Sequence, residues 1–132
     1  MNRPFELSRT LDELDPPPWG EPTYESSLVT TCHRLRKKPI GQFSVEDFRI
    51  LIGQDIGAQW LVPLALDILE RDPLVSGDFY PGDLLASILR IDSTWWRREP
   101  EWTERVRRIL AGLRQAPREV DDAVATFRHN TV

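Results

Sequence analysis

Residues 31–80 read TCHRLRKKPIGQFSVEDFRILIGQDIGAQWLVPLALDILERDPLVSGDFY, and they carry the strongest structural pattern in the chain. The stretch joins a short basic run to segments whose apolar residues recur every three or four positions, the period of one helix face. It ends in a turn at 76–80 that combines glycine, aspartate and aromatic residues. No part alternates as strands and hairpins require. The stretch therefore predicts helices joined by short turns.

The clearest helix start lies at Ser44. The Ser44 side chain suits the N-cap position, and Asp47 can replace the usual glutamate of a capping box. Phe43 and Phe48 are spaced to form a hydrophobic staple across the same start. The sequence therefore predicts both a helix from residue 45 and the direction from which the chain enters it.

Two prolines predict where the next helices begin. The most apolar segment, 58–70, predicts a central helix, and Pro63 places its start near position 59 or 60 because proline is tolerated only in the first turn. Pro81 suits the first position of the helix that follows the turn at 76–80. Both predictions rest on the same property: proline has no amide hydrogen, and the amides in the first turn of a helix make no hydrogen bond within the helix.

The basic run 34–38 lies at the end of another predicted helix. Leu28, Cys32 and Leu35 fall on one face of it and predict a buried stripe. Cations in the last turn interact favourably with the helix dipole, so this placement alone explains the run.

Similar apolar periodicity predicts helices elsewhere in the chain. The predicted ranges are 7–14, 26–37, 84–91, 102–113 and 118–128, with a short helix at 95–96. We expect an all-α fold: one compact domain, 1–132, of about six or seven helices, some of which can stack as antiparallel pairs. Three consecutive prolines make 15–22 a linker, and the tail 129–132 is expected to fray.

Composition narrows the class of protein. A chain of 132 residues can bury a sizeable core as one domain, and a net charge of −4 argues against a general nucleic-acid binder. Residues 44–92 carry nine acidic and three basic side chains. They could attract a basic partner, although ordinary surface charge is the alternative. The single cysteine, Cys32, and a first segment unlike a signal peptide indicate the cytoplasm.

No motif for catalysis or metal binding is present. The soft metal ligands are Cys32, His33 and His129, and the first two point about 100° apart on a helix. The same geometry disfavours a Cys–His nucleophile. The glycines at 53 and 57 lack the lysine of a phosphate loop. We expect no catalytic residue, no metal and no cofactor, and hence a binding protein rather than an enzyme.

Five short segments resemble a known family. They are WGEP at 19–22, CHRLR at 32–36, EDFR at 46–49, IGQ at 52–54 and GDFYPGDLL at 77–85. Over residues 10–90 the chain resembles bacterial immunity proteins of contact-dependent growth inhibition (CDI) systems, whereas the last third does not match. The resemblance implies a cytoplasmic protein. Its partner is then the cognate toxin, the C-terminal domain of a CdiA-type exported protein and in many cases a nuclease. Separately, we expect a monomer that binds neither a membrane nor nucleic acid directly.

Charge complementarity to a nuclease predicts the binding face. A nuclease presents cations to phosphates, so an inhibitor that presents carboxylates can occupy the same surface. Tyrosine is often an interface anchor. The predicted partner-binding residues are Glu21, Tyr24, Asp72, Asp78, Tyr80 and Asp83. For Asp83, capping or charging the start of the next helix is the alternative.

A second function class remains open from the sequence. A small helical nucleic-acid-binding or regulatory protein could use the run 34–38 together with arginines of the C-terminal third. Those arginines are Arg105, Arg107, Arg108, Arg114 and Arg118. Glutamates lie among them, so a solvated helix face is the simpler explanation.

Overall fold

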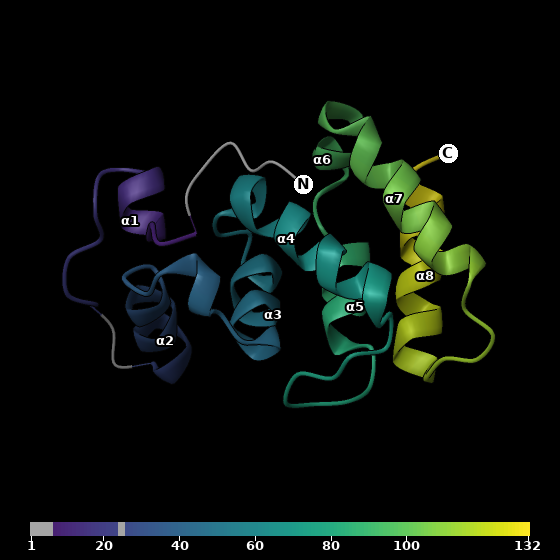
Figure 1. The fold of residues 1–132 in the computed structure, drawn as a ribbon, viewed down its shortest axis with the longest axis horizontal. Coiled ribbons are helices and arrows are strands. Elements are labelled where there is room, and N and C mark those ends of the chain that lie inside the picture. The colour runs from purple at the N-terminus through teal and green to yellow at the C-terminus, as the bar shows by residue number, and fades with distance from the viewer. Residues whose placement is uncertain (1–6, 24–25) are drawn as a thin grey trace.

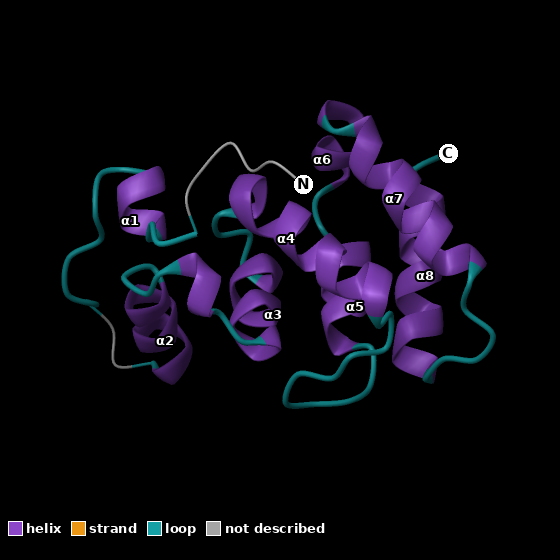
Figure 2. Ribbon diagram, viewed as in Figure 1, coloured by secondary structure: helices purple, strands orange, loops and turns teal. Residues whose placement is uncertain are grey.

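The computed structural model describes residues 7–23 and 26–132, and these residues fold into α-helices joined by loops (Figure 2). The helices are α1 (Leu11–Leu14), α2 (Ser27–Leu35), α3 (Val45–Gly53), α4 (Ala58–Arg71), α5 (Asp83–Leu89), α6 (Ser93–Arg98), α7 (Pro100–Ala111) and α8 (Arg118–Asn130), with a short 3₁₀-helix, η1 (Ile40–Gln42). No named strand occurs in the described ranges. The predicted all-α class is confirmed, with more helices than the six or seven expected.

The helices follow the chain along the long axis of the molecule (Figure 1). α1 and α2 lie at one end, α3 to α5 in the middle, and α7 and α8 at the other end. α5 packs against α3 and α8, while α4 packs against α3 and α7. One cluster of buried apolar side chains extends from Leu11 to Phe127 and includes residues of all eight α-helices.

The start of α3 matches the prediction in detail. The Asp47 amide donates to Ser44 Oγ at 3.1 Å, and the Ser44 amide donates to Asp47 Oδ2 at 3.0 Å. The rings of Phe43 and Phe48 meet edge to face with centroids 5.4 Å apart. Both the capping box and the staple are confirmed.

The starts of α4 and α5 correct the two proline predictions. α4 begins at Ala58, so Pro63 lies in its second turn and deprives the Gln59 carbonyl of a helical hydrogen bond. Gln59 is exposed, which lets water reach that part of the helix. Before α5 the N-cap is Gly82, whose φ of +90° is a left-handed conformation, so Pro81 stands outside the helix.

Three helices end two residues earlier than their apolar periodicity predicts. α2, α5 and α7 end at Leu35, Leu89 and Ala111. Beyond each end the chain continues with amide-to-carbonyl bonds that span three residues, as from Lys38 to Leu35 and from Leu113 to Leu110. A turn of this type preserves the apolar spacing but is no longer an α-helix.

The predicted buried stripe of α2 is wrong at its first member. Cys32 and Leu35 are buried, whereas Leu28 is 43% exposed. α2 lies at one end of the molecule and packs mainly against α3, so its first turn stays uncovered (Figure 1).

At the C-terminal end of the chain, α8 continues to Asn130, and the Thr131 hydroxyl donates to the Phe127 carbonyl at 2.8 Å.

A candidate partner-binding loop between α4 and α5

The segment 72–82 connects α4 to α5 and projects from the middle of the molecule (Figure 1). We refer to it as the α4–α5 loop. Ser76 and Pro81 form an isolated antiparallel bridge across it, and the Gly82 amide donates to the Val75 carbonyl at 3.3 Å. The Asp83 amide donates to the Tyr80 carbonyl at 3.1 Å. The loop is therefore folded back on itself and closed by its own backbone.

The Asp83 carboxylate holds this loop from inside. It is 2% exposed and accepts hydrogen bonds from the Gly77 amide at 2.6 Å and the Phe79 amide at 3.0 Å. Asp83 is also the first residue of α5, where the helix dipole favours a negative charge. The structure thus gives Asp83 an internal role and does not present it to a partner.

Glu46 and Arg49 of α3 also hold the loop. The Asp78 amide donates to Glu46 Oε1 at 2.9 Å, and Arg49 Nε donates to the same oxygen at 2.7 Å. The Arg49 hydrogen bond is the largest influence on the pKa of Glu46 and lowers it, with the Asp78 amide acting in the same direction against partial burial. Glu46 therefore stays ionised at neutral pH and keeps its acceptor oxygens for the loop.

Phe79 is the more exposed of the two aromatic side chains in the α4–α5 loop. Its exposed fraction is 69%, and the Arg49 guanidinium carbon lies 4.3 Å from the ring centroid, a cation–π distance. Tyr80, the aromatic residue predicted for the binding face, is half-buried against the core. Burial, followed by the nearby charges of Glu119 and Asp83, raises the pKa of Tyr80. Phe79 was not among the predicted partner-binding residues. The signal that could have identified it is its position between Asp78 and Asp83 in the sequence.

The remaining predicted residues divide between two places. Asp72 and Asp78 lie exposed at the start and middle of the α4–α5 loop, and neither side chain has a hydrogen bond or ion pair with a described residue. Glu21 is exposed and belongs to the connection between α1 and α2. That connection runs at the end of the long axis, away from the α4–α5 loop (Figure 1). Tyr24 lies outside the described residues. The structure therefore places Asp72, Asp78 and Tyr80 in one loop with Asp83 directly after it, and Glu21 in a different connection. Within the loop, Asp72 lies beside residues 112–115, whereas Asp78 lies beside α3.

Two glycines allow the close packing of the loop. A Cβ atom at Gly77 would lie 2.5 Å from Glu46 Oε1 and 3.0 Å from Asp83 Oδ2. At Gly82 a Cβ atom would lie 2.6 Å from Val120 Cγ2, in a backbone conformation that already favours glycine. The carboxylates of Glu46 and Asp83 can approach the backbone this closely because position 77 has no side chain.

Most carboxylates of the acidic segment 44–92 are engaged within the chain. The internal partners are Arg49 for Glu46, Lys38 for Asp47, Trp95 for Asp55, Arg105 for Asp67 and Glu70, the loop amides for Asp83, and Thr94 for Asp92. Asp72 and Asp78 are the carboxylates of this segment left exposed without such a partner in the described structure. Asp72 and Asp78 are thus the carboxylates that the α4–α5 loop offers to a basic surface.

The basic run 34–38 is also largely used internally. The Arg36 side chain is 2% exposed and donates from Nε to Asp12 Oδ1 at 2.8 Å. Lys37 Nζ donates to Asp12 Oδ2 at 2.6 Å, and Lys38 Nζ donates to Asp47 Oδ2 at 2.7 Å. Three of the four cations in the run therefore bind carboxylates of this chain.

The same cluster holds the proline-rich segment in place. Arg36 lies 4.5 Å from the ring centroid of Trp19, the Trp19 amide donates to Asp12 Oδ1 at 3.1 Å, and His33 Nδ1 lies 2.8 Å from the Gly20 carbonyl oxygen. Burial favours the neutral form of Asp12, but hydrogen bonds from Lys37, Trp19 and Arg36 outweigh it and lower its pKa. The segments WGEP and CHRLR thus meet in one structural cluster.

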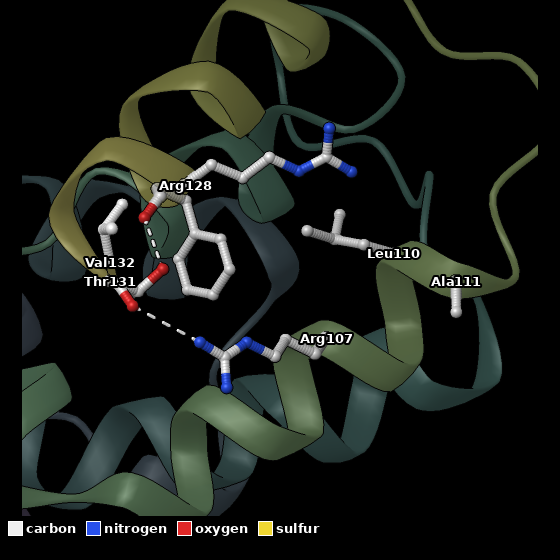
Figure 3. Close-up of a pocket in the computed structure, with 7 residues that line it drawn as sticks. Arg107, Leu110, Ala111, Arg128, Thr131 and Val132 are labelled. Atoms are coloured by element: carbon white, nitrogen blue, oxygen red, sulfur yellow. Dashed lines mark hydrogen bonds between the residues drawn. The ribbon is translucent and has the colours of Figure 1, made fainter.

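A separate hollow of about 460 Å³ lies between α7 and α8 (Figure 3). Its lining residues are Arg107, Leu110, Ala111, Phe127, Arg128, Thr131 and Val132. The Arg107 guanidinium points toward the Thr131 carbonyl oxygen, which it reaches at 3.4 Å.

In the described part of the chain, no three His, Cys, Asp or Glu side chains are grouped to hold a metal ion. No helix of this part is long and apolar enough to cross a membrane.

Comparison with known proteins identifies the family. A sequence profile described as CDI immunity proteins matches residues 13–106. The match spans the Asp83 and Glu46 supports of the α4–α5 loop and continues beyond the resembling segments into α7. Among curated proteins, none matches the chain in sequence. The profile covers well over half of the 132 residues, and the chain belongs to the family of CDI immunity proteins.

Proposed function

We propose that the chain neutralises the C-terminal toxin domain of its CDI system by binding it through the α4–α5 loop, without catalysing a reaction. The observation that carries this proposal is the exposed Phe79 ring, which is held in place although 69% of it faces solvent. Large aromatic side chains are enriched at binding hot spots. A ring that is already ordered loses little conformational entropy when a partner covers it.

The chemistry around Phe79 defines the partner surface. Asp78 precedes the ring, and Asp72 lies at the start of the same loop, both exposed. The complementary surface is an apolar pocket with a cation beside it. A nuclease toxin fits this description because it must present cations to phosphates, and we propose that binding covers that surface in the cytoplasm of the producing cell.

The nucleic-acid-binding alternative has less support. A phosphate-binding surface needs exposed, unpaired cations, but Arg36, Lys37 and Lys38 bind Asp12 and Asp47. In the C-terminal third, Arg105 pairs with Asp67 and Glu70. The internal ion pairs therefore favour the function in which acidic and aromatic residues make the contact.

The test uses the cognate toxin domain of the CDI system. The two proteins are purified separately, and their affinity is measured by titration calorimetry for the wild type and for Asp72→Lys/Asp78→Lys. We expect the double variant to bind at least about tenfold more weakly, because it places cations against a basic surface. Glu21→Lys is the charge-reversal control outside the loop, and its affinity should stay within about twofold of the wild type.

Two results would contradict the proposal in different ways. Equal affinities of the wild type and the double lysine variant would remove the α4–α5 loop from the interface. Absence of any complex with the toxin domain, together with full toxin activity in an equimolar mixture, would contradict the immunity function itself.

A further inference from the structure

We propose that Arg49 is the positioning residue of the binding loop, holding the Phe79 ring in the orientation that the toxin recognises. This inference rests on the proposed function. It adds a residue from α3 that lies outside the loop and outside the set predicted from the sequence.

The contacts of Arg49 reach both parts of the loop. Its Nε donates to Glu46 Oε1, the same oxygen that accepts the Asp78 amide. Its guanidinium carbon lies 4.3 Å from the centre of the Phe79 ring, and its Nε lies 3.9 Å from Asp83 Oδ2. A single side chain therefore connects the two carboxylates that hold the backbone with the ring that is exposed.

The other supports of the loop do not replace Arg49. Asp83 binds the backbone amides of Gly77 and Phe79, and the bridge between Ser76 and Pro81 closes the turn. These contacts act on the backbone and not on the Phe79 ring. Loss of Arg49 should thus leave the turn formed and release the ring, which lowers the fraction of molecules ready to bind.

The geometry requires an arginine and not only a positive charge. The planar guanidinium can lie against an aromatic ring while its nitrogen atoms donate to a carboxylate, as it does here with Phe79 and Glu46. A lysine ammonium can satisfy Glu46 but offers no plane to the ring. Arg49→Lys therefore separates the two roles of the side chain.

The test is a double-mutant cycle on affinity for the toxin domain. The variants are Arg49→Gln, Arg49→Lys, Phe79→Ala and the combinations of each Arg49 change with Phe79→Ala. We expect Arg49→Gln to weaken binding about tenfold, since a side chain must then be ordered on binding. Arg49→Lys should stay within about twofold of Arg49→Gln. In the Phe79→Ala background, either Arg49 change should alter affinity by less than about twofold, because the ring that Arg49 positions is absent.

Each outcome bears on a different statement. If Arg49→Gln weakens toxin binding equally in the wild-type and Phe79→Ala backgrounds, Arg49 acts through general stability. If Arg49→Lys binds with wild-type affinity, the positive charge alone suffices. Either result overturns the inference. A loss at Phe79→Ala with none at Arg49→Gln also overturns it and leaves the proposed function intact. If Arg49→Gln does not fold by circular dichroism, the Arg49→Lys half of the cycle gives the same comparison.

Discussion

Arg36 Nε donates to Asp12 Oδ1 at 2.8 Å, and the two side chains are only 2% and 9% exposed. The pair joins the end of α2 to α1, and the Asp12 amide adds a backbone bond to the Arg36 carbonyl at 3.0 Å. Lys37 and Trp19 complete the surroundings of the same carboxylate. The N-terminal end of the molecule is thus assembled around one buried charge pair.

Removing Asp12 should destabilise the protein strongly. Asp12→Ala leaves the buried guanidinium of Arg36 without its closest carboxylate, a change that typically costs about 3–5 kcal/mol. The free energy of unfolding in urea measures the effect. Arg9→Ala is the control, because it breaks the exposed pair between Arg9, which precedes α1, and Glu13 of α1, and it should have a much smaller effect. Similar losses in the two variants would show that the Arg36 pair is not the structural centre of this end.

Stability should fall on acidification. The pKa of Glu46 is lowered by Arg49, and the pKa values of Asp12 and Asp47 are lowered by hydrogen bonds that outweigh burial. For Asp47 these bonds come from Lys38 and Ser44. The unfolded chain therefore takes up protons at higher pH than the folded protein. The stabilisation is complete above the ordinary pKa values of 4.5 and 3.8, and it is lost as the pH falls through the lower folded values.

Urea unfolding between about pH 6 and about pH 3 tests this dependence. We expect a nearly constant free energy of unfolding in the upper part of the range and a decline in the lower part. Asp47→Asn should decline less steeply than the wild type because it cannot take up the proton. A protein that becomes more stable as the solution is acidified would contradict the assigned pKa directions.

Alanine at the loop glycines should be costly. At Gly82 it would be strained by a φ of +90° and would meet Val120 at 2.6 Å, and together these effects should cost at least about 2 kcal/mol. At Gly77 it would displace Glu46 and Asp83, so Gly77→Ala should also weaken toxin binding. Gly53→Ala is the control, since no atom lies within 4 Å of the new Cβ and α3 could gain up to about 1 kcal/mol. Thermal unfolding distinguishes them, and a Gly82→Ala variant as stable as Gly53→Ala would contradict the loop geometry.

The isolated protein should not bind generic nucleic acid at physiological salt. Arg36, Lys37 and Lys38 are held by Asp12 and Asp47, so few cations of the run 34–38 are available for phosphates. Fluorescence anisotropy of a labelled duplex and of a single strand, at two salt concentrations, measures any binding. Salt-dependent affinity that disappears in Lys37→Ala/Lys38→Ala would favour the nucleic-acid-binding class.

Local interactions made part of this structure predictable. Ser44 and Asp47 are three residues apart, and Phe43 and Phe48 flank the same turn, so the sequence alone contains the capping box and the staple. The α4 start was predicted wrongly because Pro63 is tolerated in the second turn. The free-energy cost of the hydrogen bond that the Gln59 carbonyl loses depends on whether solvent can reach that carbonyl, and this is a property of the folded structure.

Long-range partners limited the prediction of the candidate site. The placement of Asp78 and Phe79 depends on Glu46 and Arg49, which lie far away along the chain. For the same reason the sequence pointed to Tyr80, although the fold buries much of Tyr80 and exposes Phe79. The motif therefore indicated the loop correctly, while its exposed face required the tertiary structure.

The most direct test of the account is the affinity of Phe79→Ala for the toxin domain, measured against the wild type by titration calorimetry. Leu28→Ala is the matched control, because Leu28 is 43% exposed on α2, away from the α4–α5 loop. We expect a loss of at least about thirtyfold for Phe79→Ala, as at a hot spot, and a change of less than about twofold for Leu28→Ala. Wild-type affinity of Phe79→Ala would contradict the claim that this loop is the contact.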